Sequence, residues 1–197
     1  MSDFISQYYY KYYKGYLFDT MELNFCTQCG DPLEYKEIGD EGKQKYCKHC
    51  NKFFFDNPAS CVIVTIVNEN KQVLLLKQNY ISTKKYTLCS GYLKKGDTLE
   101  DTVVREVSEE TGQRVIYCEY VESYYFEPKN LIMTGFIAYA RTSKFTISNE
   151  VDGLIWVDME KACDMVEREN NFSGIHLDKC IERLKQSNQL GQAEQKN

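Results

Sequence analysis

Two kinds of apolar pattern alternate along the chain: continuous β-branched runs and stripes with helical spacing. The clearest run is CVIVTIV at 61–67, which predicts a buried strand, because a strand covered on both faces carries apolar side chains on both. The polar stretch 68–71 predicts a turn, and the apolar stretch 73–76 predicts the partner strand. Further strands are predicted at 86–92, 115–121, 131–140 and 154–157.

The strongest helical signal lies at 99–111. Thr98 can cap the first turn, with Asp101 three residues later as a weak capping box. Gly112 can end the helix in a left-handed conformation. Helical spacing places three valines on one apolar stripe, namely Val103, Val104 and Val107.

Two more helices are predicted further along the chain, at 159–167 and at 175–186. The second carries four apolar side chains on one face: Leu177, Cys180, Ile181 and Leu184. Strands interleaved with helices in this order suit a mixed sheet that is covered on both faces, so the expected fold class is α/β.

Composition divides the chain into four segments. Residues 1–24 form a Tyr-rich arm without a clear period, which is expected to pack its rings on the domain or on a second subunit, unless Met21 is the true start. Residues 25–56 form a small cysteine-containing module, and 57–187 form the main domain. Residues 188–197 are polar and are expected to be a disordered tail.

The overall composition is that of a globular protein. Of the 197 residues, 43% are hydrophobic and 27% are charged, which suits a packed core with a solvated surface. No apolar run approaches the roughly 20 residues of a membrane-spanning helix, and the N-terminus lacks a signal-peptide pattern. The net charge of −5 argues against broad binding to nucleic acid. Nine cysteines in such a chain indicate a reducing compartment, so we expect a cytoplasmic location.

Four of the nine cysteines form two C-x2-C pairs. Cys26 and Cys29 are separated by 17 residues from Cys47 and Cys50, which is the sequence form of a four-thiolate zinc ribbon. A closed site of this kind is structural, and we assign its zinc no catalytic role. The alternative is two disulfides or a redox pair, and His49 is interpreted as a bystander. The other cysteines lack metal-ligand spacing and are expected to be small core residues: Cys61, Cys89, Cys118, Cys163 and Cys180.

Three carboxylates stand close together on the helix predicted at 99–111. Glu106, Glu109 and Glu110 are spaced i, i+3 and i+4, which puts them on one face within reach of one another. Like charges at this separation repel and raise one another's pKa, so a cation is expected among them, and Mg²⁺ prefers such oxygen ligands. The alternative is an acidic helix face that is simply solvated.

The spacing around this helix resembles the Nudix box, G-x5-E-x7-R-E-U-x-E-E-x-G-U, in which U is apolar. Gly91, Asp97 and the run from Arg105 to Gly112 follow the pattern. Asp97 stands where the family has Glu, so its shorter carboxylate is expected to reach Arg105 less well. Gln113 stands where the family has an aliphatic residue. The resemblance implies the Nudix α/β/α sandwich, with a metal site on the box glutamates.

A second resemblance concerns the run from Ser123 to Ala138. NADH pyrophosphatases within the Nudix family carry S-Q-P-W-P-F-P-x-S-L-M at this place, and a four-cysteine ribbon directly before the Nudix domain. Ser123 and Met133 match that stretch, Phe126 stands in the Trp column, and Leu131 replaces the second Ser. Because 25 residues precede Cys26, the large N-terminal domain of that family is expected to be absent.

The same resemblance implies the metal ligands. Glu106, Glu109, Glu110 and Glu150 are expected to hold two or three Mg²⁺ or Mn²⁺ ions, and Ser90 is expected to offer its backbone carbonyl to the metal. Bound metal would neutralise the substrate and activate a water molecule. The catalytic set also includes Arg105, which is expected to hold the glutamates in place rather than to touch the substrate.

For the substrate, the resemblance implies that Tyr92 stacks on the nicotinamide ring. The full expected substrate-binding set is Tyr92, Ser123, Tyr124, Tyr125, Phe126 and Leu131. For Tyr124, Tyr125 and Phe126 the alternative is simple strand packing. Candidates for steering the anionic substrate are surface lysines, namely Lys84, Lys85, Lys94, Lys95 and Lys129.

The function that these features imply is hydrolysis of the diphosphate bond of NAD(H) to nicotinamide mononucleotide and AMP. One alternative is hydrolysis of another nucleoside diphosphate-X, such as ADP-ribose, FAD or a nucleotide sugar. The other is a nucleotide-sensing module without catalysis. Expected partners are the dinucleotide substrate and, as an open candidate, a second copy of the chain in a homodimer.

Overall fold

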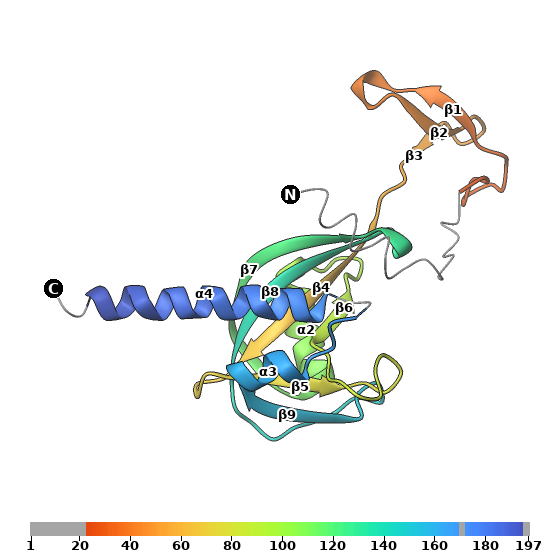
Figure 1. The fold of residues 1–197 in the computed structure, drawn as a ribbon. Helices are drawn as coiled ribbons and strands as arrows, with labels where there is room; N and C mark the ends of the chain where they lie inside the picture. Colours follow the sequence, from red (N-terminus) through yellow and green to blue (C-terminus); the bar gives the residue numbers. More distant parts are fainter. Residues whose placement is uncertain (1–22, 170–171, 195–197) are drawn as a thin grey trace.

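The computed structural model describes residues 23–169 and 172–194 of the chain (Figure 1). Most of the Tyr-rich arm predicted at 1–24 lies outside the described residues, and so does Met21. Within the described part, a small sheet at the N-terminal end is followed by a larger mixed sheet with helices on both faces. Figure 1 shows the small sheet at one end of the molecule and the last helix, α4, projecting at the other end.

The small sheet is antiparallel throughout and is the expected ribbon. Its described strands are β1 (Glu34–Glu37), β2 (Lys43–Cys47) and β3 (Lys52–Phe54). The tip between β1 and β2 is a short 3-10 turn, η1 (Gly39–Glu41), followed by Gly42 at φ 66°. This left-handed conformation favours glycine, which explains the predicted hairpin tip. The ribbon's apolar contacts are few, and the main one joins the rings of Tyr46 and Phe53 at 4.9 Å.

The main sheet, within the described residues, runs in the order β7-β8-β4-β5-β9, with β6 paired to β4. Its strands are β4 (Ala59–Val67), β5 (Gln72–Lys77), β6 (Cys89–Tyr92), β7 (Arg114–Phe126), β8 (Leu131–Arg141) and β9 (Gly153–Asp158). The β4–β8 pair is parallel and the other pairs are antiparallel. The turn between β7 and β8 is η2 (Glu127–Lys129). The expected mixed sheet is therefore confirmed.

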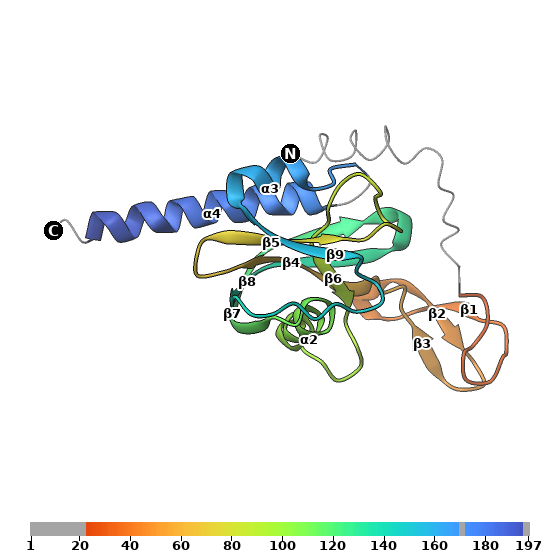
Figure 2. The same cartoon turned by 90° about the horizontal axis from the view of Figure 1, so that it is seen from below.

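Strand β4 explains why helices cover both faces of this sheet. Alternate side chains of a strand point to opposite faces. Val62 and Val64 pack with α2 (Leu99–Thr111) on one face, and Ile63 packs with the other helices on the opposite face. Those other helices are α3 (Met159–Met165) and α4 (Ser173–Glu194). Figure 2 shows the three layers edge-on, which confirms the predicted α/β/α sandwich.

Helix α2 begins and ends where local chemistry predicts. Thr98 Oγ1 accepts from the Asp101 backbone N at 3.1 Å, and Asp101 Oδ2 accepts from the Thr98 backbone N at 3.0 Å, so the capping box is complete. Gly112 ends the helix at φ 70°. The predicted apolar stripe holds for Val103 and Val107, which are fully buried.

The stripe is wrong for one residue, Val104, which is 47% exposed. Each helical residue turns by about 100°, so the residue after Val103 leaves the core-facing side. Residues three and four apart share a face, whereas adjacent residues do not. The buried face of α2 is therefore narrower than predicted.

Three other boundaries differ from the predicted ones. The strand predicted at 86–92 is shorter, since only Cys89–Tyr92 pair continuously and the residues before it make isolated bridges. The strand predicted at 115–121 continues to Phe126 as β7, because β8 pairs along its full length across two register shifts. Helix α4 continues to Glu194, into the segment predicted at 188–197 as a disordered tail.

Candidate active site and cysteine cluster

The predicted active site begins with a close approach between β6 and α2. A Cβ atom on Gly91 would lie 2.0 Å from the carboxylate carbon of Glu106, so any other residue here would displace the Glu106 side chain from its observed position. Gly91 pairs with Val62, on the face of the sheet that α2 covers. The neighbouring residues Ser90 and Tyr92 therefore point their side chains to the other face, and Tyr92 is 55% exposed.

Arg105 ties the helix to the loop before it and to β6. Its Nε donates to Asp97 Oδ2 at 3.1 Å, and its Nη2 donates to the backbone O of Tyr92 at 3.0 Å. Its Nη1 donates to the carboxylate of Glu106 and, at 3.4 Å, to Glu109 Oε2. Asp97 thus reaches Arg105 despite its shorter side chain. The arginine holds two of the box glutamates as expected.

Glu110 differs from the other box glutamates because it is buried. It is 4% exposed and lies against the fully buried Cys89. Burial raises the pKa of Glu110 to about 7, and the negative charges of Glu106 and Glu150 add to the rise. Its Oε2 atom is buried and has no hydrogen-bond partner. A buried carboxylate oxygen without a partner costs free energy unless a cation or donor meets it.

The loop that carries Glu150 is fastened from both sides. The Glu150 backbone N donates to Ser148 Oγ at 3.2 Å, and the next residue, Val151, is buried in the core on the α2 face. Asp152 then accepts from the Asn79 backbone N at 2.7 Å through Oδ2. These contacts place the charge of Glu150 close enough to raise the pKa of Glu110.

The carboxylates share one region but are not gathered around a single point. Among the described residues, the groups of three or more ligating side chains with donor atoms within 4.8 Å of one another both lie in the ribbon. Glu106 and Glu109 are turned toward Arg105. The unpartnered Oε2 of Glu110 and the all-oxygen donor set fit a hard divalent cation such as Mg²⁺ or Mn²⁺.

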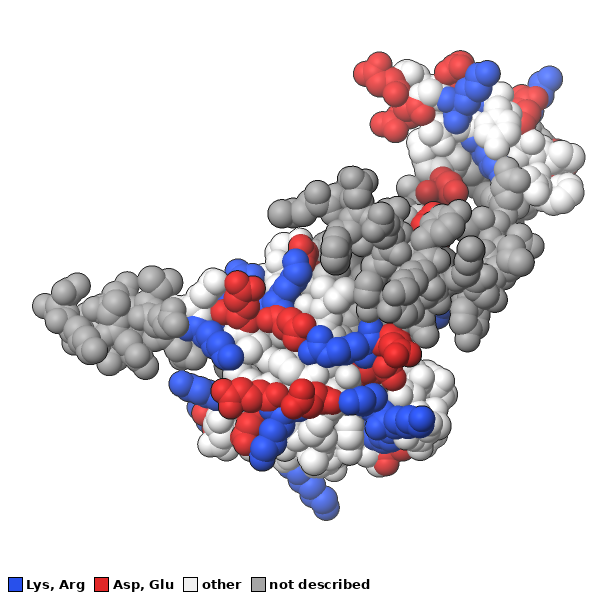
Figure 3. Space-filling model, viewed as in Figure 1, with Lys and Arg blue, Asp and Glu red and all other residues white. Residues whose placement is uncertain are grey.

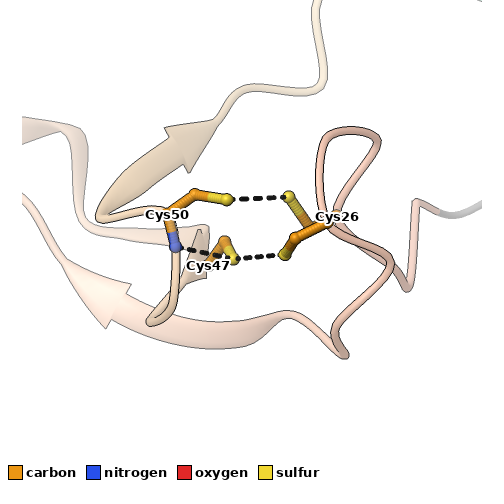
Figure 4. A group of neighbouring side chains, drawn as sticks. Cys26, Cys47 and Cys50 are labelled. Atoms are coloured by element: carbon orange, nitrogen blue, oxygen red, sulfur yellow. Dashed lines mark hydrogen bonds between the residues drawn. The ribbon is translucent and has the colours of Figure 1, made fainter.

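The ligating atoms of Cys26, Cys29, Cys47 and Cys50 form one group, and Figure 4 shows Cys26, Cys47 and Cys50 turned toward one another. The sulfur atoms of Cys26 and Cys50 are 3.9 Å apart, and those of Cys29 and Cys47 are 3.5 Å apart. In a tetrahedral site with zinc–sulfur bonds of about 2.3 Å, the sulfurs are roughly 3.8 Å apart, so the cluster fits zinc. All four thiols are free rather than disulfide-bonded. The cluster therefore agrees with the predicted ribbon and not with its disulfide alternative.

His49 lies beside the cluster rather than within the four-sulfur set. Its Nδ1 is 3.0 Å from Asp31 Oδ2, and together with Cys29 these two side chains form a second, exposed group of ligating atoms. The interpretation of His49 as a bystander is compatible with this contact. Of the remaining cysteines, Cys61, Cys89 and Cys180 are buried as predicted, and Cys118 and Cys163 are partly buried.

The predicted substrate-binding residues of β7 and β8 fall on two faces of the sheet. Tyr124 stacks on Phe172 at 5.0 Å, and Phe126 meets the same ring edge-on at 6.0 Å. Phe126 and Leu131 are buried in the core beneath α4. Tyr124 and Phe126 therefore pack against the core in this structure, which agrees with the alternative of simple strand packing for these two rings. Their strand neighbours Ser123 and Tyr125 point to the opposite face and are exposed.

Comparison with known proteins agrees with this arrangement. The family model described as NUDIX domain matches residues 57–178, more than half of the chain. The chain belongs to the Nudix family. The match covers β4 to α4, including Gly91, Arg105 and the box glutamates.

Individual relatives define how far the likeness extends. The NAD-capped RNA hydrolase NudC of Vibrio atlanticus (strain LGP32) is 31% identical over 149 residues, which cover 74% of this chain and 53% of that protein. The chain thus spans about half the length of the curated relatives it matches. A solved Nudix hydrolase from Nitrosomonas europaea has a TM-score of 0.58 at 24% identity, covering 80% of this chain and 88% of its own.

A second solved structure is the Nudix domain of Shewanella oneidensis NrtR in complex with ADP ribose. Its TM-score is 0.57 at 17% identity, and the likeness covers 71% of this chain and 94% of that chain. At these identities the two solved structures show the fold alone. No helix in the described part of this chain is both long and apolar enough to cross a membrane.

The departure from the Nudix box at Gln113 has a structural reason. Its side chain is 1% exposed, but both ends are hydrogen-bonded. Oε1 accepts from the Ser143 backbone N at 3.0 Å, and Nε2 donates to the Ser143 and Thr111 carbonyls at 3.3 Å. The amide thus fastens the loop after β8 to the end of α2, where an aliphatic residue would make no such bonds.

The lysines proposed for steering do not form a basic patch in the described surface. Lys94 lies 3.8 Å from Glu109, and Lys85 donates to the Asp164 carbonyl at 2.5 Å. Acidic and basic side chains are intermixed over the face seen in Figure 3.

Two site residues were missed in the sequence, Tyr80 and Asp152. They belong to neither the Nudix box nor the downstream motif, and long-range loop contacts bring them to the glutamates.

Proposed function

We propose that this Nudix protein hydrolyses the diphosphate linkage of nucleotide substrates, with NAD(H) cleaved to nicotinamide mononucleotide and AMP. The observation that carries the proposal is the buried, unpartnered carboxylate oxygen of Glu110, beside glutamates that Arg105 holds in place. An anionic diphosphate cannot approach such an acidic surface without cations. The site therefore implies bound divalent metal, with Mg²⁺ or Mn²⁺ as the suitable ions.

The metal ligands in this proposal are Glu106, Glu109, Glu110 and Glu150, with the backbone carbonyl of Ser90. When bound, the metal neutralises the diphosphate and lowers the pKa of a coordinated water. One of the box glutamates is the proposed acceptor of the proton that this water releases.

Arg105 acts through the glutamates rather than on the substrate. Its guanidinium is 18% exposed and bonded to Asp97, to two box glutamates and to the β6 backbone. Its Nε, Nη1 and Nη2 atoms each donate to an atom of the protein. Holding the carboxylates in fixed positions lowers the cost of organising the site during the reaction.

For the base-recognition half of the substrate, exposed aromatic rings are the proposed contacts. Tyr92 and Tyr125 are 55% and 53% exposed. A flat base stacked on such a ring gains about 1–3 kcal/mol in nucleic-acid analogues. Ser123 lies on the Tyr125 face, whereas Tyr124, Phe126 and Leu131 support the strand from within the core.

The proposed domain organisation assigns residues 25–56 to a ribbon that holds structural Zn²⁺ and residues 57–187 to the hydrolase. The fit of the four sulfurs to a tetrahedral ion supports the zinc. The V. atlanticus relative is named as an NAD-capped RNA hydrolase, which supports a substrate that contains NAD, and the ADP ribose in the S. oneidensis structure supports ADP-ribose as the main alternative. FAD, nucleotide sugars and a sensing role without catalysis complete the alternatives.

A substrate panel tests this proposal. Purified protein is incubated with Mg²⁺ or Mn²⁺ and, separately, with NADH, NAD⁺, ADP-ribose, FAD, a nucleotide sugar and an NAD-capped RNA, and AMP or 5′-monophosphate release is measured. We expect the highest kcat/KM on NADH or NAD⁺. A higher value on ADP-ribose, FAD or a nucleotide sugar would replace NAD(H) as the substrate. Binding without turnover in both metals would favour the sensing module.

A further inference from the structure

The loop between β5 and β6 presents one tyrosine from a fastened backbone. Gln78 is 2% exposed, and its Oε1 accepts from Thr87 Oγ1 at 2.6 Å. The Nε2 of the same amide donates to the phenolic oxygen of Tyr80 at 3.1 Å. A buried amide that is bonded at both ends is costly to reorient, because a flip would leave polar atoms without partners. The position of the Tyr80 oxygen is therefore set from within the fold.

This loop is also fastened to the loop that carries Glu150. Asp152 Oδ2 accepts from the Asn79 backbone N at 2.7 Å, and the Asp152 backbone N donates to the Lys77 carbonyl at 2.8 Å. Asn79 directly precedes Tyr80, and Asp152 follows Glu150 by two residues. The two hydrogen bonds therefore bring Tyr80 to the same edge of the sheet as Glu150.

The direction of the hydrogen bonds leaves the Tyr80 hydroxyl hydrogen available. Because the phenolic oxygen accepts from Gln78, its own hydrogen points to another acceptor, and no residue in the described part of the chain is assigned that role. Tyr80 is 69% exposed, so a ligand can reach it. Burial raises the pKa of Tyr80, and the negative charges of Glu110 and Glu150 add to the rise, which agrees with the position that the two loop hydrogen bonds give to the phenol.

We propose that Tyr80 contacts the substrate, and that its hydroxyl donates a hydrogen bond to a diphosphate oxygen at the Glu110–Glu150 edge of the site. The inference rests on the proposed function, because it takes the diphosphate to lie over these carboxylates. A neutral donor suits this position, since a lysine here would form an ion pair with the glutamates and compete with a divalent cation for them. Asp152 and Gln78 are then positioning residues that act through Tyr80 and its loop.

The test compares two single-oxygen deletions on the same loop. Tyr80→Phe removes the proposed donor, and Tyr86→Phe removes a phenolic oxygen whose ring packs against the core on the α4 face. A hydrogen bond to a charged group contributes about 1.5–3 kcal/mol, which corresponds to roughly a 10- to 150-fold loss. We expect Tyr80→Phe to lower kcat/KM by at least about tenfold on NADH and on ADP-ribose, and Tyr86→Phe to leave it unchanged.

A second readout separates substrate contact from an effect on the metal site. The Mg²⁺ concentration for half-maximal activity is expected to be the same for Tyr80→Phe and the wild type, because the proposed bond is to phosphate. If the wild type is active and Tyr80→Phe has the same kcat/KM, the inference is overturned and the proposed function stays intact. A changed Mg²⁺ requirement as the sole effect would also overturn it, by assigning the hydroxyl to a carboxylate.

If the wild type turns over none of the panel, the proposed function fails and the inference is decided by binding. Calorimetric titration of ADP-ribose in Mg²⁺ then replaces kinetics. Weaker binding to Tyr80→Phe, by about tenfold, with unchanged binding to Tyr86→Phe would support the contact. Equal binding to all three proteins, or no binding to any, would overturn it.

Discussion

Burial distinguishes Glu110 from Glu109, its neighbour in the Nudix box. Glu110 is buried against Cys89, its pKa is raised to about 7, and one of its carboxylate oxygens has no partner. Glu109 on the same helix is half exposed and bonded to Arg105. Residues of the same type on one helix face thus differ in burial and in hydrogen bonding.

Replacing Glu110 by Gln tests that difference. Glutamine keeps the size and helix propensity but removes the anionic ligand, so transition-state stabilisation worth several kcal/mol should be lost. We expect kcat to fall on the order of 10²- to 10³-fold, with an unchanged circular dichroism spectrum and melting temperature. Steady-state kinetics on the best panel substrate is the measurement. Retention of more than about a tenth of wild-type kcat would remove Glu110 from the site.

Asp97 offers a second test at this scale. Its carboxylate reaches Arg105 Nε at 3.1 Å, so the missing methylene does not break the ion pair. We expect Asp97→Glu to have kcat/KM equal to or above that of the wild type, with an unchanged ranking of NADH against ADP-ribose. The matched control, Asp97→Asn, removes the charge at the same length and is expected to lower activity. A loss of about tenfold or more for Asp97→Glu would mean that the loop is fitted to the shorter side chain.

At the scale of elements, local signals and long-range contacts can be separated. The ends of α2 were predicted correctly because Thr98, Asp101 and Gly112 act within one turn of the helix. The length of β7 was not, because its last residues are kept in a strand by pairing with β8. The first residues of the strand predicted at 86–92 instead make isolated bridges. Tyr86 pairs with Val166 and Thr87 pairs with Leu76 of β5, and no local pattern reveals these pairings.

The ribbon is the element whose stability depends most directly on a metal ion. Its few apolar contacts cannot hold three short strands, and zinc binding supplies folding free energy in such modules. We expect one Zn²⁺ per chain by elemental analysis, and Cys47→Ser to lose it and to become sensitive to limited proteolysis within residues 25–56. The partly buried Cys163, replaced by Ser, is the control. Zinc-free wild-type protein that resists proteolysis equally would contradict the zinc assignment.

Helix α4 carries a buried histidine that makes stability depend on pH. Burial lowers the pKa of His176 to about 4, and Lys179 adds to the effect, whereas bonding to Phe136 O and the charge of Glu122 oppose it. Because the unfolded chain has the higher pKa, this contribution is complete above about pH 6.5 and is lost as pH falls toward 4.

The measurement is the free energy of unfolding in urea between pH 7.5 and 4.5. The lowered pKa of His176 corresponds to a loss of at most about 3 kcal/mol in the free energy of unfolding as the pH falls. His176→Gln keeps a polar side chain that can bond to Phe136 O and is expected to give a flatter pH dependence than the wild type. Parallel curves for the two proteins would show that other groups cause the dependence.

For the whole molecule, the sequence predicted the Nudix family and the α/β/α sandwich. It did not predict that the Asn79 backbone N donates to Asp152 Oδ2 and so holds the loop of Tyr80 beside the loop of Glu150, because this hydrogen bond joins residues 73 apart in the chain. Nor did it predict which aromatic residues of β7 face the core. Tyr124 and Phe126 both pack on the ring of Phe172, which is distant from them in the sequence. Features that depend on neighbouring residues can be predicted from the sequence, whereas contacts between distant loops can be identified only from the folded structure.

Metal-dependent cleavage of the diphosphate bridge of NAD(H) at the box glutamates is the activity that we propose for this chain. Its most direct test is product analysis of NADH incubated in ¹⁸O-labelled water with Mg²⁺, for the wild type and for Glu110→Gln. We expect equal amounts of AMP and reduced nicotinamide mononucleotide, with ¹⁸O on the phosphate of one of them, and loss of both products with EDTA or in Glu110→Gln. Undiminished cleavage in EDTA or by Glu110→Gln, or release of free nicotinamide instead, would contradict it.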